Sequence, residues 1–202
     1  MSVEGFVFVD LETTGVVAAE CEILEIGFAL YTNDLRPVER FEMLAVTTGT
    51  TDLIAQVRSD PAFDFVRNMH TDNGLLADLE AEVGARGRDL PADLSGYESA
   101  VVDILTRWGV DSSTDLCGSS LRMDRAFLAR WMPKVDAMFS YRIIDASSFR
   151  GAGMKLDRER AEARVALVTE FLSPALRVAG DIHNSANLLR VFHDLAPIPF
   201  AA

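Results

Sequence analysis

The sequence predicts an α/β or α+β domain with a mixed β-sheet, because strand patterns open the chain and strands alternate with helices afterwards. Three apolar runs come first, at residues 6–10, 23–31 and 40–46. The connection between the last two is short and carries the turn signals Asn33, Asp34 and Pro37. These three runs therefore predict an antiparallel meander at the start of the domain.

The later part of the chain alternates short strands with amphipathic helices. Apolar residues spaced near 3.6 predict helices over residues 99–108, 124–132 and 181–194. Short apolar runs predict strands over 115–118 and 142–145. Residues 150–170 are charged and rich in alanine, which is typical either of a surface helix or of a mobile, inserted segment.

Length and composition restrict the class of protein. A chain of 202 residues predicts one domain over residues 1–202. No apolar run approaches the length of a membrane span, and the N-terminus lacks the pattern of a secretory signal. Cys21 and Cys117 form no CxxC pattern, so we expect neither a zinc site nor a disulfide, and we expect a cytoplasmic location.

The charge of the chain restricts its partners. Lys and Arg number 19 against 31 Asp and Glu, a net charge of −12. This balance argues against a long positive track for duplex DNA or RNA. It is compatible with a very short nucleic acid that is held by metal ions and a few local donors.

Two carboxylates stand at the end of the first apolar run. Asp10 and Glu12 are two residues apart, so in extended backbone they point to the same side of the sheet. Such a pair is costly unless a basic side chain or a metal ion joins it, and oxygen ligands suit Mg²⁺ or Mn²⁺. Asp124 and Asp181 begin two predicted helices, where N-terminal capping is the simpler role. A solvated turn is likewise the simpler reading of Asp10 and Glu12 when they are taken alone.

Six segments in order carry a more specific pattern. They are VDLETTGV (9–16), ILEIGFALYT (23–32), VRNMHTDNGLLADL (66–79), LCGSSLRMDRAFLARWMP (116–133), YRIIDASS (141–148) and GDIHNSANLL (180–189). Together they resemble the oligoribonuclease family within the DEDD superfamily of 3′→5′ exonucleases. The resemblance implies a ribonuclease H-like mixed sheet flanked by helices. A haloacid-dehalogenase-like phosphotransferase fits less well, because Glu12 stands where that motif has a second Asp.

The resemblance implies a set of functional residues. Asp10, Glu12, Asp124 and Asp181 would be catalytic and would hold two divalent cations, Mg²⁺ or Mn²⁺. The substrate would be short RNA or a dinucleotide, cleaved from its 3′ end to 5′-mononucleotides. Val16 matches the apolar wedge between the two bases, and His70 matches a histidine on the substrate side. A homodimer is implied, in which Tyr141 and Arg142 come from the second subunit. The groups that match the cap on the 5′ phosphate are Ser120, Arg142, Ser147 and Ser148.

One position departs from the family pattern. The family's general-base histidine lies five residues before the last Asp, and Leu176 stands there. The related branch has tyrosine four residues before that Asp, and Arg177 stands there. Neither leucine nor arginine can take a proton from water.

No other residue clearly supplies the missing base. His183 is about 200° around the predicted helix from Asp181, on its expected outer face with Ala186, Asn187 and Arg190. His193 lies further along that helix, and Asp157 or Glu170 would have to reach the site from the undecided segment. Two hypotheses follow: a weakened or rewired exoribonuclease, and a non-catalytic protein that binds and sequesters dinucleotides.

Overall fold

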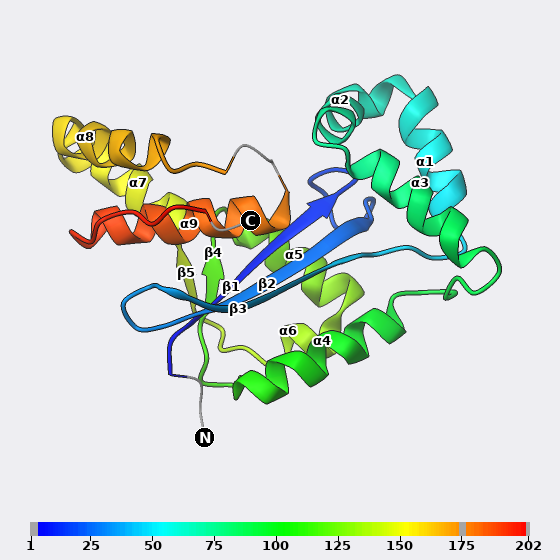
Figure 1. Cartoon of the computed structure of the whole chain (residues 1–202), viewed down its shortest axis with the longest axis horizontal. Coiled ribbons are helices and arrows are strands. Elements are labelled where there is room, and N and C mark those ends of the chain that lie inside the picture. Colours follow the sequence, from blue (N-terminus) through cyan, green and yellow to red (C-terminus); the bar gives the residue numbers. More distant parts are fainter. Residues whose placement is uncertain (1–3, 174–176, 201–202) are drawn as a thin grey trace.

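The computed structural model of the chain describes residues 4–173 and 177–200. Five strands form one sheet in the order β3-β2-β1-β4-β5 (Figure 1). The β1–β2 and β2–β3 pairs are antiparallel, whereas β1–β4 and β4–β5 are parallel. The sheet is therefore mixed, as the sequence predicts. Its strands are β1 (Phe6–Thr13), β2 (Ile23–Tyr31), β3 (Pro37–Leu44), β4 (Leu116–Gly118) and β5 (Ile143–Asp145).

Helices cover both faces of the sheet. Phe8 of β1 packs toward α9 (Val178–Phe192), where it joins Ile182 and Leu189 in one apolar cluster. The alternate residues Val7 and Val9 point to the other face and join the main core. That core also contains residues of α4 (Ser95–Trp108) and α5 (Arg122–Trp131) and is continued by α6 (Pro133–Asp136).

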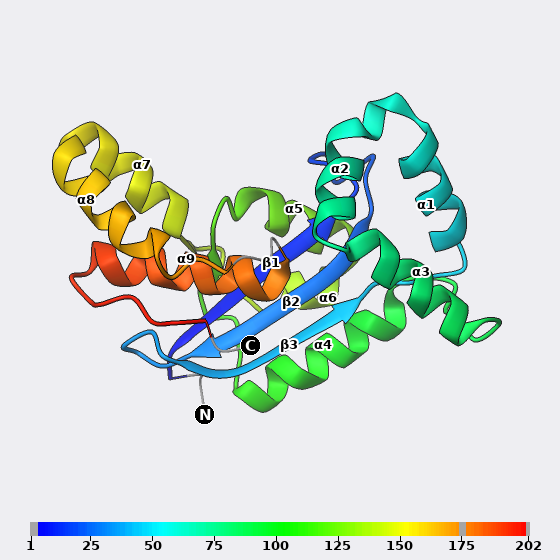
Figure 2. The same cartoon turned by 45° about the horizontal axis from the view of Figure 1, so that its top comes forward.

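A helical cap stands beyond the end of β1 at which its carboxylates lie. It consists of α1 (Thr50–Ser59), the short 3₁₀ turn η1 (Pro61–Phe63), α2 (Asp64–Asp72) and α3 (Leu75–Arg86) (Figures 1 and 2). The periodicity of the sequence predicts no element between residues 46 and 99. The reason is that α1 and α2 bury few side chains: only Thr50, Ile54 and Val57 in α1 and His70 in α2 are buried.

Residues 150–170 lie in two helices, α7 (Ala146–Leu156) and α8 (Arg158–Thr169). Both pack on each other and on α9 (Figure 2). None of the helices in the described part of the chain has the length and apolar content that a membrane crossing requires.

The start of α9 lies very close to the sheet. A Cβ atom added to Gly27 of β2 would meet the Val178 side chain at 2.6 Å, so only glycine permits this approach. The expectation that His183, Ala186, Asn187 and Arg190 face outward is wrong, because all four are buried. The segment that follows α9 covers three of them, because its backbone hydrogen-bonds Asn187 and Arg190 and its Phe200 packs on His183. Ala186 lies instead in the apolar cluster with Phe8 of β1. A helical wheel drawn for α9 alone omits this segment.

Candidate functional site

Three carboxylates converge where β1 meets α9. Asp10 and Glu12 lie on the same face of β1, and Asp181 lies in the first turn of α9. Each offers one oxygen within 4.8 Å of the other two. The close approach of α9 over Gly27 brings Asp181 to the strand, which sequence spacing alone cannot establish.

The fourth predicted carboxylate, Asp124, is anchored beside this group. It comes from the first turn of α5 and is 3% exposed. Its Oδ1 accepts a hydrogen bond of 3.1 Å from the backbone N–H of Leu11, the residue between Asp10 and Glu12. Asp124 is thus fixed against β1 and adds its charge to that of Asp10.

The electrostatics of this cluster are those of crowded, buried or half-buried carboxylates. Burial raises the pKa of Asp10 well above its usual range, and the charges of Asp124 and Asp181 act in the same direction. Burial likewise raises the pKa of Glu12 to about 8, that of Asp124 to about 7 and that of Asp181 to about 6. Like charges held together in this way favour either bound protons or a bound cation.

The donor set fits a hard divalent cation. All four side chains offer carboxylate oxygens, which Mg²⁺ and Mn²⁺ prefer. Three of them already lie close enough to share an ion. Asp10, Glu12 and Asp181 are therefore the residues that would hold a metal, with Asp124 adjacent.

A buried ion pair lies beside Glu12. Glu25 of β2 is the cross-strand neighbour of Glu12 and is almost fully buried. The Arg177 guanidinium donates to both of its oxygens, at 2.7 and 2.5 Å. A third bond of 2.9 Å joins Arg177 to Asp78 of α3. No role for Glu25 is predicted from the sequence, although a glutamate inside an otherwise apolar strand is a signal that it has a partner.

His70 is part of the support for β1 rather than an open substrate group. It is fully buried in α2, and its Nε2 lies 3.0 Å from the Thr13 carbonyl oxygen. Nε2 therefore carries the proton, because a carbonyl can only accept. Its Nδ1 lies 3.8 Å from a Glu12 oxygen. Burial lowers the pKa of His70, so the ring is neutral at pH 7.

A cleft opens on the carboxylates between α9, α7 and α8. It has a volume of about 360 Å³. Asp10 and Asp181 lie in it beside Asn184, and Arg150 of α7 is the basic residue of its lining. Neither Asn184 nor Arg150 is predicted from the sequence as a site residue, although Asn184 stands three residues after Asp181 and so on the same side of the helix. The remaining lining residues are Ser119, Val165, Val168, Thr169, Leu172, Ser185 and Leu188.

The residues expected to cap a 5′ phosphate gather around another carboxylate. Asp145 accepts hydrogen bonds from the backbone N–H of Ser120 at 3.2 Å and from the Ser147 hydroxyl at 2.6 Å. It also accepts from the N–H of Ser148 at 3.3 Å, where it caps α7. Arg142 is exposed and lies 3.5 Å from Asp115. Three of the four expected groups therefore meet at Asp145, and Arg142 stands apart on a different partner.

The expected wedge residue lies at the surface. Val16 follows β1 and is 77% exposed. An apolar side chain at that exposure is free to contact a ligand.

The structure offers little in place of the missing histidine. Leu176 itself lies outside the described residues. Asp157 is engaged as the N-cap of α8, and Glu170 is an exposed residue at the end of that helix. His193 is exposed and packs edge-on against Phe149, at 5.3 Å between ring centres. Of the three histidines, only His70 lies beside a carboxylate of the cluster.

Comparison with known sequences finds similarity to oligoribonucleases. No protein-family model matches it. It is 26% identical over 149 residues to an oligoribonuclease of Francisella tularensis subsp. novicida, covering 74% of this chain and 76% of that protein. It is 28% identical over 194 residues to the oligoribonuclease of Mycobacterium leprae, covering 96% of this chain and 81% of that one. The chain is therefore similar in sequence to oligoribonucleases over most of its length.

Solved structures support the fold of the chain. The zinc-bound Escherichia coli ExoI–ssDNA complex matches 96% of the chain with a TM-score of 0.55 and 13% identity. Exonuclease I of Methylocaldum szegediense matches 95% with a TM-score of 0.54 and 12% identity. The chain spans about two fifths of the length of these exonucleases, 41% and 42%. The likeness confirms the ribonuclease H-like fold that the sequence resemblance predicts.

Proposed function

We propose that the chain is a metal-dependent 3′→5′ exoribonuclease that degrades short oligoribonucleotides and dinucleotides to 5′-mononucleotides. The observation that carries the proposal is the meeting of Asp10, Glu12 and Asp181, with Asp124 fixed beside them. Asp10 and Asp181 of this group also line a cleft. Homology to oligoribonucleases over most of the chain supports the same reaction.

The carboxylates would hold two divalent cations, Mg²⁺ or Mn²⁺. When bound, such cations activate water and stabilise the leaving oxygen of a phosphodiester. The role of the chain is to keep the four carboxylates fixed and partly desolvated. Burial strengthens each electrostatic interaction that these oxygens make.

The cleft would bind the substrate with few positive charges. Arg150 could pair with a phosphate, and the neighbouring apolar side chains could contact a base or ribose. Val16 would act as the wedge between two bases, and Arg142 with Ser120, Ser147 and Ser148 would meet the 5′ phosphate. A chain with a net charge of −12 suits a short ligand better than a long one.

The attacking water must lose a proton, and in the family pattern a histidine accepts it. Leu176 stands at the position of that histidine in this sequence. Loss of a general base typically slows a reaction by ~10²–10⁴-fold. We therefore propose reduced turnover. The second candidate, a protein that sequesters dinucleotides, is favoured by the same substitution and disfavoured by the intact set of carboxylates.

The experiment is a length series. Purified protein is incubated with Mn²⁺ and 5′-labelled RNA of two, three, five, ten and twenty nucleotides, and products are separated over time. The proposal predicts mononucleotide release from the 3′ end, fastest on the shortest RNA. Binding of the dinucleotide without product would favour the sequestering protein, and internal cleavage of long RNA would contradict both.

A further inference from the structure

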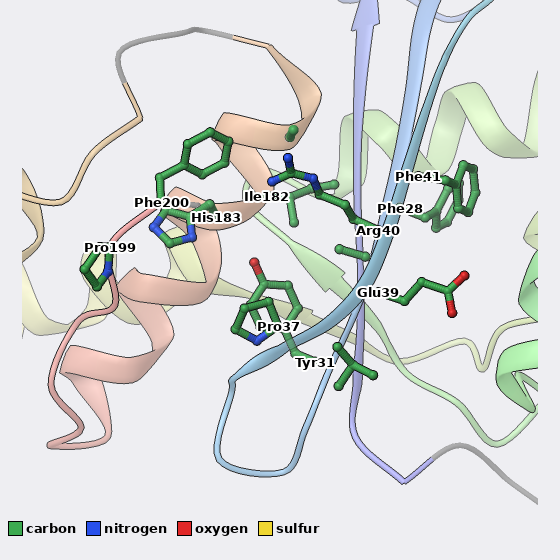
Figure 3. A pocket seen from close by; sticks show the side chains of 13 residues that line it. Phe28, Tyr31, Pro37, Glu39, Arg40, Phe41, Ile182, His183, Pro199 and Phe200 are labelled. Carbon is green, nitrogen blue, oxygen red and sulfur yellow. The ribbon is translucent and has the colours of Figure 1, made fainter. Parts of the chain in front are cut away.

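The first turn of α9 carries Asp181, and open space borders that turn on several sides. Ala179 lines a cavity of about 250 Å³ between α9, β2 and β3, whose walls include Ile182 and Tyr31 (Figure 3). Gly180 lines another cavity, of about 420 Å³. Asp181 lines the cleft between α9, α7 and α8. Open space supplies no packing contacts, so the position of Asp181 depends on the contacts at the very start of the helix.

Val178 and Arg177 provide those contacts. Val178 lies so close to Gly27 of β2 that a Cβ atom there would meet it at 2.6 Å. Arg177 is the N-cap residue of α9, and its carbonyl accepts a hydrogen bond of 2.9 Å from the Asp181 N–H. One hydrogen bond thus separates the Arg177 backbone from a carboxylate residue that would ligate a cation.

The Arg177 side chain is tied to two other elements. Its guanidinium donates to both oxygens of Glu25 on β2, at 2.7 and 2.5 Å, and to Asp78 of α3 at 2.9 Å. Glu25 is the cross-strand neighbour of Glu12. A bidentate guanidinium–carboxylate pair has a fixed orientation, which a lysine ammonium does not reproduce. The start of α9 is thereby fixed relative to the strand beside Glu12.

The charges of this pair act on the carboxylate cluster in opposite directions. Burial is the main cause of the raised pKa of Glu12, the charge of Glu25 raises it further, and the charge of Arg177 lowers it. Because the two charges are held together, their effects on the cluster oppose each other. The contribution of Arg177 to the cluster is therefore mainly one of position.

We propose that Arg177 is a positioning residue, which holds Asp181 against β1 and thereby sets the affinity of the carboxylate cluster for a divalent cation. The inference rests on the cation site of the proposed function and extends it to a side chain that touches no cation. Loss of a residue that orients metal ligands typically weakens metal binding by ~10–100-fold. Arg177 acts through the helix backbone, so we expect the lower end of that range.

The test is Mn²⁺ binding without RNA, measured from the electron paramagnetic resonance signal of free Mn²⁺. Arg177→Lys keeps the charge but loses the bidentate pair, and Mn²⁺ should bind this variant about tenfold more weakly. Arg58→Lys is the matched control, because Arg58 pairs with Glu80 at 2.8 Å on the exposed surface of the cap. It should bind Mn²⁺ as the unmodified protein does. Asp10→Asn should lose most of the binding, and undiminished binding there would overturn the proposal.

A second variant separates position from charge and from stability. Arg177→Met combined with Glu25→Gln removes both charges together and leaves no buried carboxylate without a partner. Mn²⁺ should again bind about tenfold more weakly, because the two side chains no longer hold each other. Chemical unfolding of the same variant shows whether the chain is folded under the binding conditions. A purely structural role would lower its stability and leave the Mn²⁺ affinity of the folded protein unchanged.

Unchanged Mn²⁺ affinity in both Arg177→Lys and the double variant would overturn the proposal. A protein that binds no Mn²⁺ would overturn it as well. The RNA length series tests the nuclease reaction separately. Mn²⁺ binding that weakens in the expected variants, in a protein that cleaves no RNA, would support the positioning role and contradict the nuclease.

Discussion

Asp10, Glu12, Asp124 and Asp181 are held in the fold with pKa values above their ordinary ones. Such a group gives stability that is complete below its unfolded pKa, near 4, and is lost as pH rises through its folded pKa. The reason is that the folded state keeps protons that the unfolded chain has already released. The carboxylates of the site therefore work against the stability of the metal-free protein at neutral and alkaline pH.

The first prediction follows from the upward direction of these pKa shifts. In EDTA, the free energy of unfolding should fall between pH 4 and pH 8 through these groups, by on the order of a few kcal/mol. Mn²⁺ added at pH 8 should restore it, because a cation then replaces the missing protons. Urea unfolding at pH 5 and pH 8 measures both effects. A metal-free protein that is more stable at pH 8, and indifferent to Mn²⁺, would show that these groups do not form a cation site.

The second prediction concerns the missing base. Leu176→His should raise the rate of dinucleotide cleavage, by up to ~10²-fold, if the base is all that the site lacks. Leu176→Asn is the matched control, since it adds polarity without a base of suitable pKa. Equal rates in both variants would mean that the proton already has another acceptor.

Much of the carboxylate cluster can be predicted at the level of single residues, but the residues around it cannot. Asp10 and Glu12 stand out because carboxylates end an apolar run, and Asp181 joins them in the structure. The pairing of Glu25 with Arg177 depends on strand register and on where α9 begins. Neither is encoded in local spacing, so this pair emerges only from the fold.

Among elements, Arg177 connects three that are distant in sequence. It stands at the N-cap of α9 and reaches β2 through Glu25 and α3 through Asp78. The Asp78 side chain, which binds Arg177 from α3, is exposed to solvent, whereas the Glu25 side chain is only 5% exposed. Most of the stabilisation at this junction therefore depends on the pair with Glu25.

The third prediction tests that pair. Arg177→Met should lower the free energy of unfolding by about 3 kcal/mol, because it leaves the Glu25 carboxylate buried without a partner. Adding Glu25→Gln to the same chain should recover much of the loss. Chemical unfolding of both variants measures this. A double variant as unstable as Arg177→Met alone would mean that Arg177 acts through other contacts.

Helices and strands are predicted more accurately from the sequence when more of their residues are buried. β2 occupies the predicted range 23–31, and its nine residues are buried except Leu30, which is half-buried. The cap helices α1 and α2 bury few residues. Too few apolar residues therefore recur at helical spacing for the sequence to predict these two helices. The charged segment 150–170 contains part of α7 and most of α8. These two helices pack against each other and against α9.

At the scale of the whole molecule, we propose a homodimer built on the β5 edge. β5 ends the sheet on one side, and the residues around it include exposed apolar side chains. Tyr141 is 86% exposed and Ile143 is 40% exposed. An uncovered edge of this kind is a natural surface for a second copy.

The fourth prediction is that light scattering after gel filtration gives the mass of a dimer. Ile143→Arg should shift it to a monomer and lower dinucleotide cleavage, since Arg142 of one copy would no longer reach the substrate of the other. Val38→Arg is the control, because Val38 is exposed on the opposite edge strand. A monomer that retains full activity would contradict the shared site.

The central claim is that the carboxylate cluster cleaves short RNA with the help of divalent cations. The most direct measurement is a timed incubation of 5′-phosphorylated diribonucleotide and Mn²⁺ with the purified protein, beside Asp10→Ala. Asp103→Asn serves as control, because it removes an exposed carboxylate on α4, away from the site. We expect 5′-mononucleotide with the unmodified protein and with Asp103→Asn, and none with Asp10→Ala. Equal product from all three, or none from any, would contradict it.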